Sequence, residues 1–229
     1  MSSLINQQVR LASRPDGIPQ AENFAITTSP VPTLGEGEIL IHNHYLSVEP
    51  AMRGWVSNVA NYSEPVAINE VMRSFATGQV IESKHPDFQA GEYVTGLFGW
   101  QDYAVVTAET IIRKVDDGPL PISTSLGVLG LNGMTAYFGL LDVGQPREGD
   151  TVVVSTAAGA VGSCVGQIAK LKGCQTVGIA GGDTKVALCR DRFQYDRAVD
   201  YKSEHFEQAL AEACPQGVDV DFDNTGGSI

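Results

Sequence analysis

The sequence predicts an α/β protein whose first part is rich in β-strands and whose second part is a doubly wound parallel sheet. In the first part, short apolar runs recur between turns rich in Pro and Gly, a pattern typical of a barrel or a sandwich. In the second part, strands and helices alternate, which requires a parallel sheet with crossover helices. A glycine-containing turn joins the first of these strands to its helix. These observations divide the chain into domains at 1–128 and 129–229.

The β-rich part contains apolar runs that predict strands at Glu38–Leu46, Thr77–Glu82, Tyr93–Phe98 and Tyr103–Thr107. The stretch Ala60–Arg73 is less regular, and we interpret it as a long loop over a site. Small and apolar residues at helical spacing then predict a hinge helix over Gly133–Asp142.

The second part begins with Thr151–Thr156, a β-branched run without alternation that suits a strand covered on both faces. The expected elements that follow are a helix at Ser163–Lys172, a strand at Gln175–Ala180, a helix at Asp183–Phe193, a strand at Ala198–Val199, a helix at Ser203–Cys214 and a strand at Val218–Phe222. We expect Asp183 and Ser203 to be N-caps. A complete sheet of this kind has about six strands. Since about four are predicted here, we expect the sheet to be incomplete and the chain to be a fragment.

The turn Ala157–Gly162 matches the dinucleotide-binding fingerprint, with Ala at the first glycine position. Gly159 would let the backbone approach a pyrophosphate, and Gly162 would let the helix pack closely on the strand. The N–H groups at the start of the helix would bind the phosphate. An ordinary βα turn of small residues is the alternative interpretation.

The end of the second strand favours NADP(H) over NAD(H). An acidic residue usually binds the adenosine ribose there, but this chain has Ala180-Gly181-Gly182. Glycine leaves room for a 2′-phosphate, and Lys185 lies one helical turn later. The alternatives are that Lys185 is a solvated surface residue and that Asp183 contacts the ribose.

Several classes of protein do not fit the composition. The formal net charge of −12 argues against nucleic acid and anionic membranes as partners. No signal peptide or membrane-spanning run is present in the sequence, and the four cysteines form no CxxC pair, so we expect a cytoplasmic protein. We expect no metal, because His42 and His44 share a strand face but lack a third ligand. No hydrolytic nucleophile motif is found.

Specific stretches make the chain resemble the zinc-free medium-chain dehydrogenases/reductases. They are Leu11–Gly17, Tyr45–Pro50 with Met52–Gly54, Gly99–Tyr103, Gly127–Gly130, Thr135–Asp142, Gly166–Gly173 and Asp223–Gly227. The similarity is strongest to the branch of leukotriene/prostaglandin reductases and 2-alkenal reductases, and within it to bacterial NADPH-dependent curcumin reductases. The resemblance implies a GroES-like barrel followed by a Rossmann domain. It also implies NADPH-dependent reduction of the C=C bond of an α,β-unsaturated carbonyl compound, and a homodimer by analogy.

The resemblance also implies roles for individual residues. The pyrophosphate would be held by Ala160, Val161, Gly162 and Ser163. Lys185 would bind the 2′-phosphate, Tyr201 would lie at the adenosine end, and Asn224 would support the nicotinamide side. Tyr62 matches a tyrosine near the substrate.

Two features depart from the family pattern. Pro50-Ala51-Met52-Arg53-Gly54 stands where the family has Pro-Tyr-Met-Arg-Gly, so one aromatic side chain near the substrate is lost. That loss favours an enone other than a bulky aromatic one. The family also continues for roughly a hundred residues, with more strands and part of the substrate wall. Quinone reduction and a non-catalytic, NADP-binding truncated chain therefore remain as alternatives.

Tyr62 is the candidate catalytic residue, because a neutral phenol can donate to an enolate oxygen or protonate a carbon. The alternative is a plain pocket wall. Arg53 either contacts substrate or forms a structural ion pair. Thr135 and Tyr137 lie either near the nicotinamide or in the core.

Overall fold

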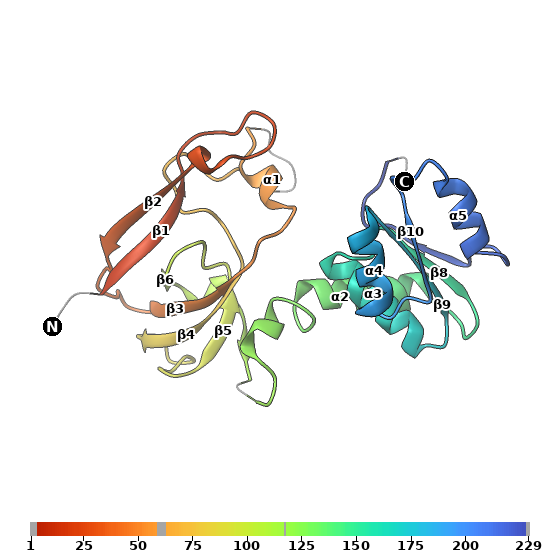
Figure 1. The fold of residues 1–229 in the computed structure, drawn as a ribbon. Helices are drawn as coiled ribbons and strands as arrows, with labels where there is room; N and C mark the ends of the chain where they lie inside the picture. Colours follow the sequence, from red (N-terminus) through yellow and green to blue (C-terminus); the bar gives the residue numbers. More distant parts are fainter. Residues whose placement is uncertain (1–3, 59–62, 117, 228–229) are drawn as a thin grey trace. The chain divides into compact units, whose positions relative to one another are not determined.

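The structure is a computed structural model that describes residues 4–58, 63–116 and 118–227. The chain forms two compact units, Met1–Leu126 and Gly127–Ile229. Figure 1 shows β-strands dominating the first unit, and helices surrounding a sheet in the second.

The first unit contains two antiparallel sheets. One pairs β1 (Ile5–Leu11) with β2 (Phe24–Pro30). The other has the order β6-β3-β4-β5-β7. Its strands are β3 (Ile39–Leu46), β4 (Ala76–Ser83), β5 (Tyr93–Gly96), β6 (Tyr103–Val106) and β7 (Ile111–Val115). The short helices of this unit are η1 (Ala21–Asn23), α1 (Met52–Trp55), η2 (Ala108–Thr110) and η3 (Ile122–Ser125).

Two apolar clusters stabilise this unit. Ile39, Ile41 and Phe98 belong to a cluster inside the five-stranded sheet, where inward-facing residues alternate with outward-facing ones. Met52 and Trp55 of α1 belong to a second cluster with Leu11 of β1. The second cluster therefore holds α1 against the start of the chain.

The second unit is built on a four-stranded parallel sheet of order β10-β9-β8-β11. Its elements are α2 (Leu131–Phe138), the π-helix η4 (Gly139–Gly144), β8 (Thr151–Val154), α3 (Ala160–Leu171), β9 (Gln175–Ala180), α4 (Asp183–Asp191), β10 (Arg197–Asp200), α5 (Phe206–Ala213) and β11 (Val220–Phe222). No helix in the described part of the chain is long and apolar enough to cross a membrane.

Helices cover both faces of this sheet. Val152 and Val154 pack in one cluster with Val165 and Ala169 of α3. Val153, between them, faces the opposite cluster, which includes residues of α5. This arrangement confirms the predicted fold class: a β-rich part followed by a doubly wound parallel sheet.

Several predicted boundaries were wrong by a few residues. Helix α3 starts at Ala160 rather than Ser163, so Gly162 lies inside its first turn. The N-cap of α4 is Gly182, and Asp183 is already helical. Helix α5 starts at Phe206 with His205 as its N-cap, and the Ser203 hydroxyl accepts a local bond from the N–H of His205 (3.2 Å).

Candidate functional site

The candidate site lies at the carboxyl edge of the parallel sheet. The strand order runs from β8 through β9 to β10 on one side and to β11 on the other. The order in which strands are added to the sheet therefore reverses between β8 and β11. Ligands of open α/β sheets bind at such a switch point. The fingerprint turn follows β8, and the loop containing Asn224 follows β11.

Close packing at the start of α3 explains the second fingerprint glycine. A Cβ on Gly162 would lie 2.4 Å from the carbonyl oxygen of Thr156 and 2.8 Å from the Cα of Ala157. No side chain fits at those separations, so the helix can approach the strand only with glycine here. Thr156 itself has a φ of 49°, which turns the chain from strand into helix.

The first turn of α3 has backbone N–H groups without a backbone acceptor. In the described residues, the N–H groups of Ala160, Val161 and Gly162 donate to no backbone acceptor. Helix N-termini with such groups bind phosphate. Ser163 differs from these three, since its N–H donates to the Gly159 carbonyl (2.9 Å) and its hydroxyl to the Ala160 carbonyl (3.0 Å). Of the four residues predicted to hold the pyrophosphate, three therefore have an uncommitted backbone donor.

The end of β8 is bonded to the loop after β11. The Ser155 hydroxyl donates to Asp223 (2.6 Å), and the Asn224 side-chain amide donates to the Ser155 carbonyl (2.9 Å). Asp223 also accepts from the N–H groups of Thr225 (2.9 Å) and Gly226 (2.8 Å). The hydroxyl of Ser155, with these two N–H groups, lowers the pKa of the Asp223 carboxyl. Asn224 is thus held beside the fingerprint strand.

A hollow of about 210 Å³ lies where β9 and β10 end, beside the fingerprint turn. Gly159, Lys185 and Tyr201, three of the predicted cofactor residues, line it together. The space over Gly181 is taken by the Tyr201 ring, because a Cβ there would lie 2.7 Å from that ring. Gly181 also lines the hollow, so the expectation that it leaves room for a phosphate stays a prediction. Its lack of a side chain accommodates Tyr201 as well.

Sequence analysis missed Lys202, which also lines this hollow. Its Nζ lies 6.0 Å from the centroid of the Tyr201 ring. Asp200 accepts from the N–H groups of Gly182 and Lys202 (both 2.9 Å), and these bonds lower the pKa of its carboxyl. Asp183 is not among the lining residues. Lys202 lies two residues after the third parallel strand, at the edge where such sheets bind ligands, and this position could have identified it.

The other candidate residues lie elsewhere. Tyr62 lies outside the described residues. Arg53 is exposed on α1. Thr135 and Tyr137 are both exposed on α2, and the Tyr137 and Phe138 rings meet edge to face at 5.3 Å between centroids. Neither of these two residues packs in a core of the described chain.

No cluster of metal ligands is found in the described ranges. His42 and His44 lie with ring centroids 5.1 Å apart, but no group of three or more His, Cys, Asp or Glu side chains suited to a metal occurs there. The four cysteines are free. Burial raises the pKa of the Cys164 and Cys189 thiols, which disfavours the nucleophilic thiolate.

Comparisons with known proteins cover both units. Residues 7–114 match the family model described as the N-terminal domain of oxidoreductase, and residues 160–229 match the model described as zinc-binding dehydrogenase. The chain is 47% identical over 224 residues to the NADPH-dependent curcumin reductase of Escherichia coli (strain K12), covering 98% of this chain and 65% of that protein.

Two further relatives agree with this match. Over 229 residues the chain is 37% identical to the 2-alkenal reductase (NADP(+)-dependent) of Nicotiana tabacum, covering 98% of this chain and 67% of that protein. The crystal structure of CurA in complex with NADPH from Vibrio vulnificus has a TM-score of 0.90 and 50% identity, covering 97% of this chain and 66% of that one. The chain spans about two thirds of the length of these relatives.

Proposed function

Because the chain belongs to the medium-chain dehydrogenase/reductase family, we propose that the protein is an NADPH-dependent reductase of the C=C bond of α,β-unsaturated carbonyl compounds. Relatives at 47% and 37% identity are named for reactions of this kind. Within this proposal, residues 129–229 bind the cofactor and residues 1–128 contribute to the substrate site.

One observation carries the proposal: two lysines line a small hollow that reaches Gly159, the residue directly before the free N–H groups of α3. The hollow reaches Gly159 at the start of α3, and Lys185 and Lys202 line its other side. A nucleotide with a pyrophosphate and a 2′-phosphate has anionic groups for both sets of donors. The residues present therefore fit NADP(H), with Tyr201 at the adenosine end and Asn224 towards the nicotinamide.

The proposed reaction needs a hydride from the cofactor and a proton or hydrogen-bond donor from the chain. When bound, NADPH supplies the hydride that adds to the β-carbon of the enone. Negative charge then builds on the carbonyl oxygen, and a proton must reach the α-carbon. Tyr62 is proposed to donate its phenolic hydrogen bond to that oxygen or to supply that proton. The unperturbed pKa of a phenol is about 10, so this group is neutral and a donor at pH 7.

The substrate is proposed to be an enone or alkenal other than a bulky aromatic one. Ala51 stands just before α1, where the family motif has an aromatic side chain, so one aromatic contact near the substrate is lost. That loss favours substrates other than curcumin itself. Quinone reduction is the competing activity and is separated by substrate profiling.

A homodimer is proposed by analogy with the family. The net charge of −12 supports the absence of nucleic-acid and anionic-membrane partners. Four free cysteines support a reducing compartment such as the cytoplasm.

Two measurements on the protein test the proposal. The first is a fluorescence titration with NADPH and NADH, in which we expect tighter binding of NADPH. The second is NADPH oxidation with a panel of enones, alkenals and quinones. Turnover of enones or alkenals supports the proposal, whereas turnover of quinones alone would replace it with quinone reduction. Binding of NADPH without turnover of any member of the panel would favour a non-catalytic role.

A further inference from the structure

Thr156, the residue directly before the fingerprint turn, has a backbone conformation that threonine rarely adopts. Its φ is 49°, in the left-handed region. A β-branched residue is an outlier there, because its Cβ crowds the following carbonyl oxygen, whereas glycine would adopt this conformation without strain. Strained residues of this kind persist only where the surrounding structure holds them, and they cluster at ligand-binding sites. The strain at Thr156 therefore calls for a functional explanation.

The side chain of Thr156 lies over the start of α3. A Cβ added to Gly159 would lie 2.9 Å from Cγ2 of Thr156, and the Thr156 carbonyl accepts the N–H of Gly159 (2.8 Å). The next three residues are Ala160, Val161 and Gly162, whose N–H groups have no backbone acceptor in the described chain. Thr156 is thus packed against the residue that precedes the proposed phosphate donors.

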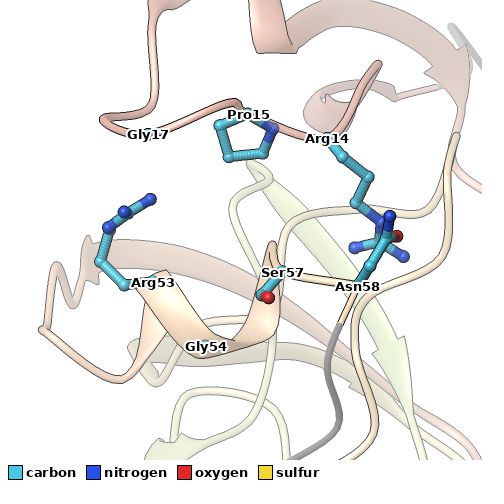
Figure 2. Close-up of a pocket in the computed structure, with 7 residues that line it drawn as sticks. All are labelled: Arg14, Pro15, Gly17, Arg53, Gly54, Ser57 and Asn58. Carbon is cyan, nitrogen blue, oxygen red and sulfur yellow. The ribbon is translucent and has the colours of Figure 1, made fainter.

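Thr156 also lines the hollow of about 210 Å³, together with Lys185 and Tyr201. The hollow in Figure 2 is a different one, of about 570 Å³, between the loop Arg14–Gly17 and α1 of the first unit. None of the residues that line that larger hollow is a predicted cofactor residue. Thr156 therefore borders the hollow at which the nucleotide is proposed to bind.

A second threonine is bonded to Thr156. Oγ1 of Thr225, in the loop after β11, lies 2.6 Å from Oγ1 of Thr156, and either hydroxyl can be the donor. This bond uses one of the two hydroxyl hydrogens. The Ser155 hydroxyl is only a distant acceptor for the other, at 3.4 Å from Thr225, and it gives its own hydrogen to Asp223 (2.6 Å). Both threonines are exposed, so the pair retains a hydrogen that can be donated to a ligand.

We propose that Thr156 binds the pyrophosphate of the dinucleotide, by donating its hydroxyl hydrogen to a phosphate oxygen. The proposal rests on the proposed function. Thr225 is a positioning residue, because its own hydroxyl donates to Thr156 and so leaves the Thr156 hydrogen for the phosphate. A hydrogen bond to a charged oxygen is stronger than one between neutral groups. In a chain with a formal net charge of −12, each such local donor offsets an unfavourable overall field.

The test measures binding to the protein by calorimetry with three nucleotides. They are NADPH, 2′-phospho-ADP-ribose, which keeps the pyrophosphate without the nicotinamide, and 2′,5′-ADP, which lacks the pyrophosphate. Thr156→Val removes the hydroxyl and keeps the branched side chain, Thr156→Ser keeps the hydroxyl, and Thr156→Gly removes both the hydroxyl and the strain. Thr225→Val and Thr225→Ser examine the partner in the same way. The control is Thr28→Val, which removes an exposed hydroxyl from β2 of the first unit.

Affinity should follow the hydroxyl of Thr156. We expect Thr156→Val and Thr156→Gly to bind NADPH and 2′-phospho-ADP-ribose about tenfold more weakly, the size of one hydrogen bond to a charged group. Thr156→Ser and Thr28→Val should bind them like wild type, and 2′,5′-ADP should bind equally to every variant. Thr225→Val should weaken NADPH binding about threefold, and Thr225→Ser should restore it.

Urea unfolding separates this role from a structural one. Thr156→Gly should unfold at a higher urea concentration than Thr156→Val, because glycine relieves the strain that valine retains. The two variants should nevertheless lose the same affinity for NADPH. If Thr156→Gly instead binds NADPH as tightly as wild type or more tightly, the side chain is neutral or an obstacle, and the proposal is overturned.

The remaining outcomes distinguish this proposal from the proposed function. An equal loss of 2′,5′-ADP binding would overturn the assignment to the pyrophosphate. Unchanged NADPH binding in Thr225→Val would overturn the positioning role of Thr225. Unchanged binding in every variant, together with enone-dependent NADPH oxidation, would overturn the role of Thr156 and leave the reductase standing. Failure of the wild-type protein to bind any of the three nucleotides would overturn both.

Discussion

The hydroxyl of Tyr195 donates to the carbonyl oxygen of Gly162, the last fingerprint glycine, at 2.6 Å. Tyr195 follows α4 and is only 3% exposed. Its ring fills the space above Gly166, where a Cβ would lie 2.3 Å away. Burial raises the pKa of the phenol well above its usual range, so the group remains a donor at any working pH. Tyr195 therefore links the fingerprint helix to the segment between α4 and β10.

Removal of this hydroxyl tests the link. We expect Tyr195→Phe to lower the free energy of unfolding by about 1 kcal/mol, the usual net value of one hydrogen bond. NADPH affinity should fall a few-fold, because the first turn of α3 loses a restraint. Urea unfolding and a fluorescence titration measure the two effects. Tyr93→Phe, in β5 of the first unit, is the matched control, since no hydrogen bond of the Tyr93 hydroxyl is found in the described chain. Equal effects in both variants would argue against the link.

Gly162→Ala tests the close approach of helix and strand. The added methyl group would meet backbone atoms 2.4 Å and 2.8 Å away, which cannot move as a flexible side chain can. We expect destabilisation of about 1–3 kcal/mol, typical of an overpacked interior, together with loss of NADPH binding. The control is Gly118→Ala, whose new Cβ has no neighbour nearer than 3.6 Å. A Gly162→Ala variant as stable as wild type would contradict this packing.

Lysines at the hollow should determine cofactor preference. We expect Lys185→Ala to weaken NADPH binding about fivefold and to leave NADH binding unchanged, because only NADPH carries the 2′-phosphate. Lys202→Ala should act in the same direction. Lys172→Ala removes an exposed lysine away from the hollow and serves as the control. Equal losses for both nucleotides would refute a 2′-phosphate role.

Asp223 should make stability depend on acid pH. Its folded pKa is lowered by bonds from Ser155 and two backbone N–H groups, so the unfolded chain binds the proton more readily. The contribution is therefore fully present above the unfolded pKa of about 4, and it is lost as the pH falls through the folded pKa. We expect Asp223→Asn to flatten the decline in unfolding free energy over this acid range. Asp221→Asn, which removes a carboxyl within β11, is the control variant.

Tyr62→Phe tests the candidate donor. We expect turnover with an enone to fall by about 100-fold or more, the effect of losing one donor to a developing oxyanion, with NADPH affinity preserved. Single-turnover kinetics and a cofactor titration separate the two quantities. Unchanged turnover would make Tyr62 a wall residue only.

Sequence patterns predicted the parallel half of the fold better than the start of the β-rich half. Strand β9 was predicted with its observed bounds, because its β-branched and apolar residues lie between glycine turns at Gly173 and Gly181-Gly182. Strand β1 gave only a weak apolar signal, since Asn6 and Gln8 are buried in it along with Leu11. Both side-chain amides bond to Gln101, far along the chain (3.1 Å and 2.7 Å). Polar residues satisfied by a distant partner leave no local pattern to detect.

The sequence by itself determined the order of the elements, the fingerprint turn and the family, because strand periodicity, glycine spacing and family motifs are local properties of the chain. Only the tertiary structure decided that Lys202 joins Lys185 and Tyr201 around one hollow. The physical reason is that this hollow forms between segments brought together by long-range packing. Which donors remain unpaired depends on neighbours that adjacent residues do not specify.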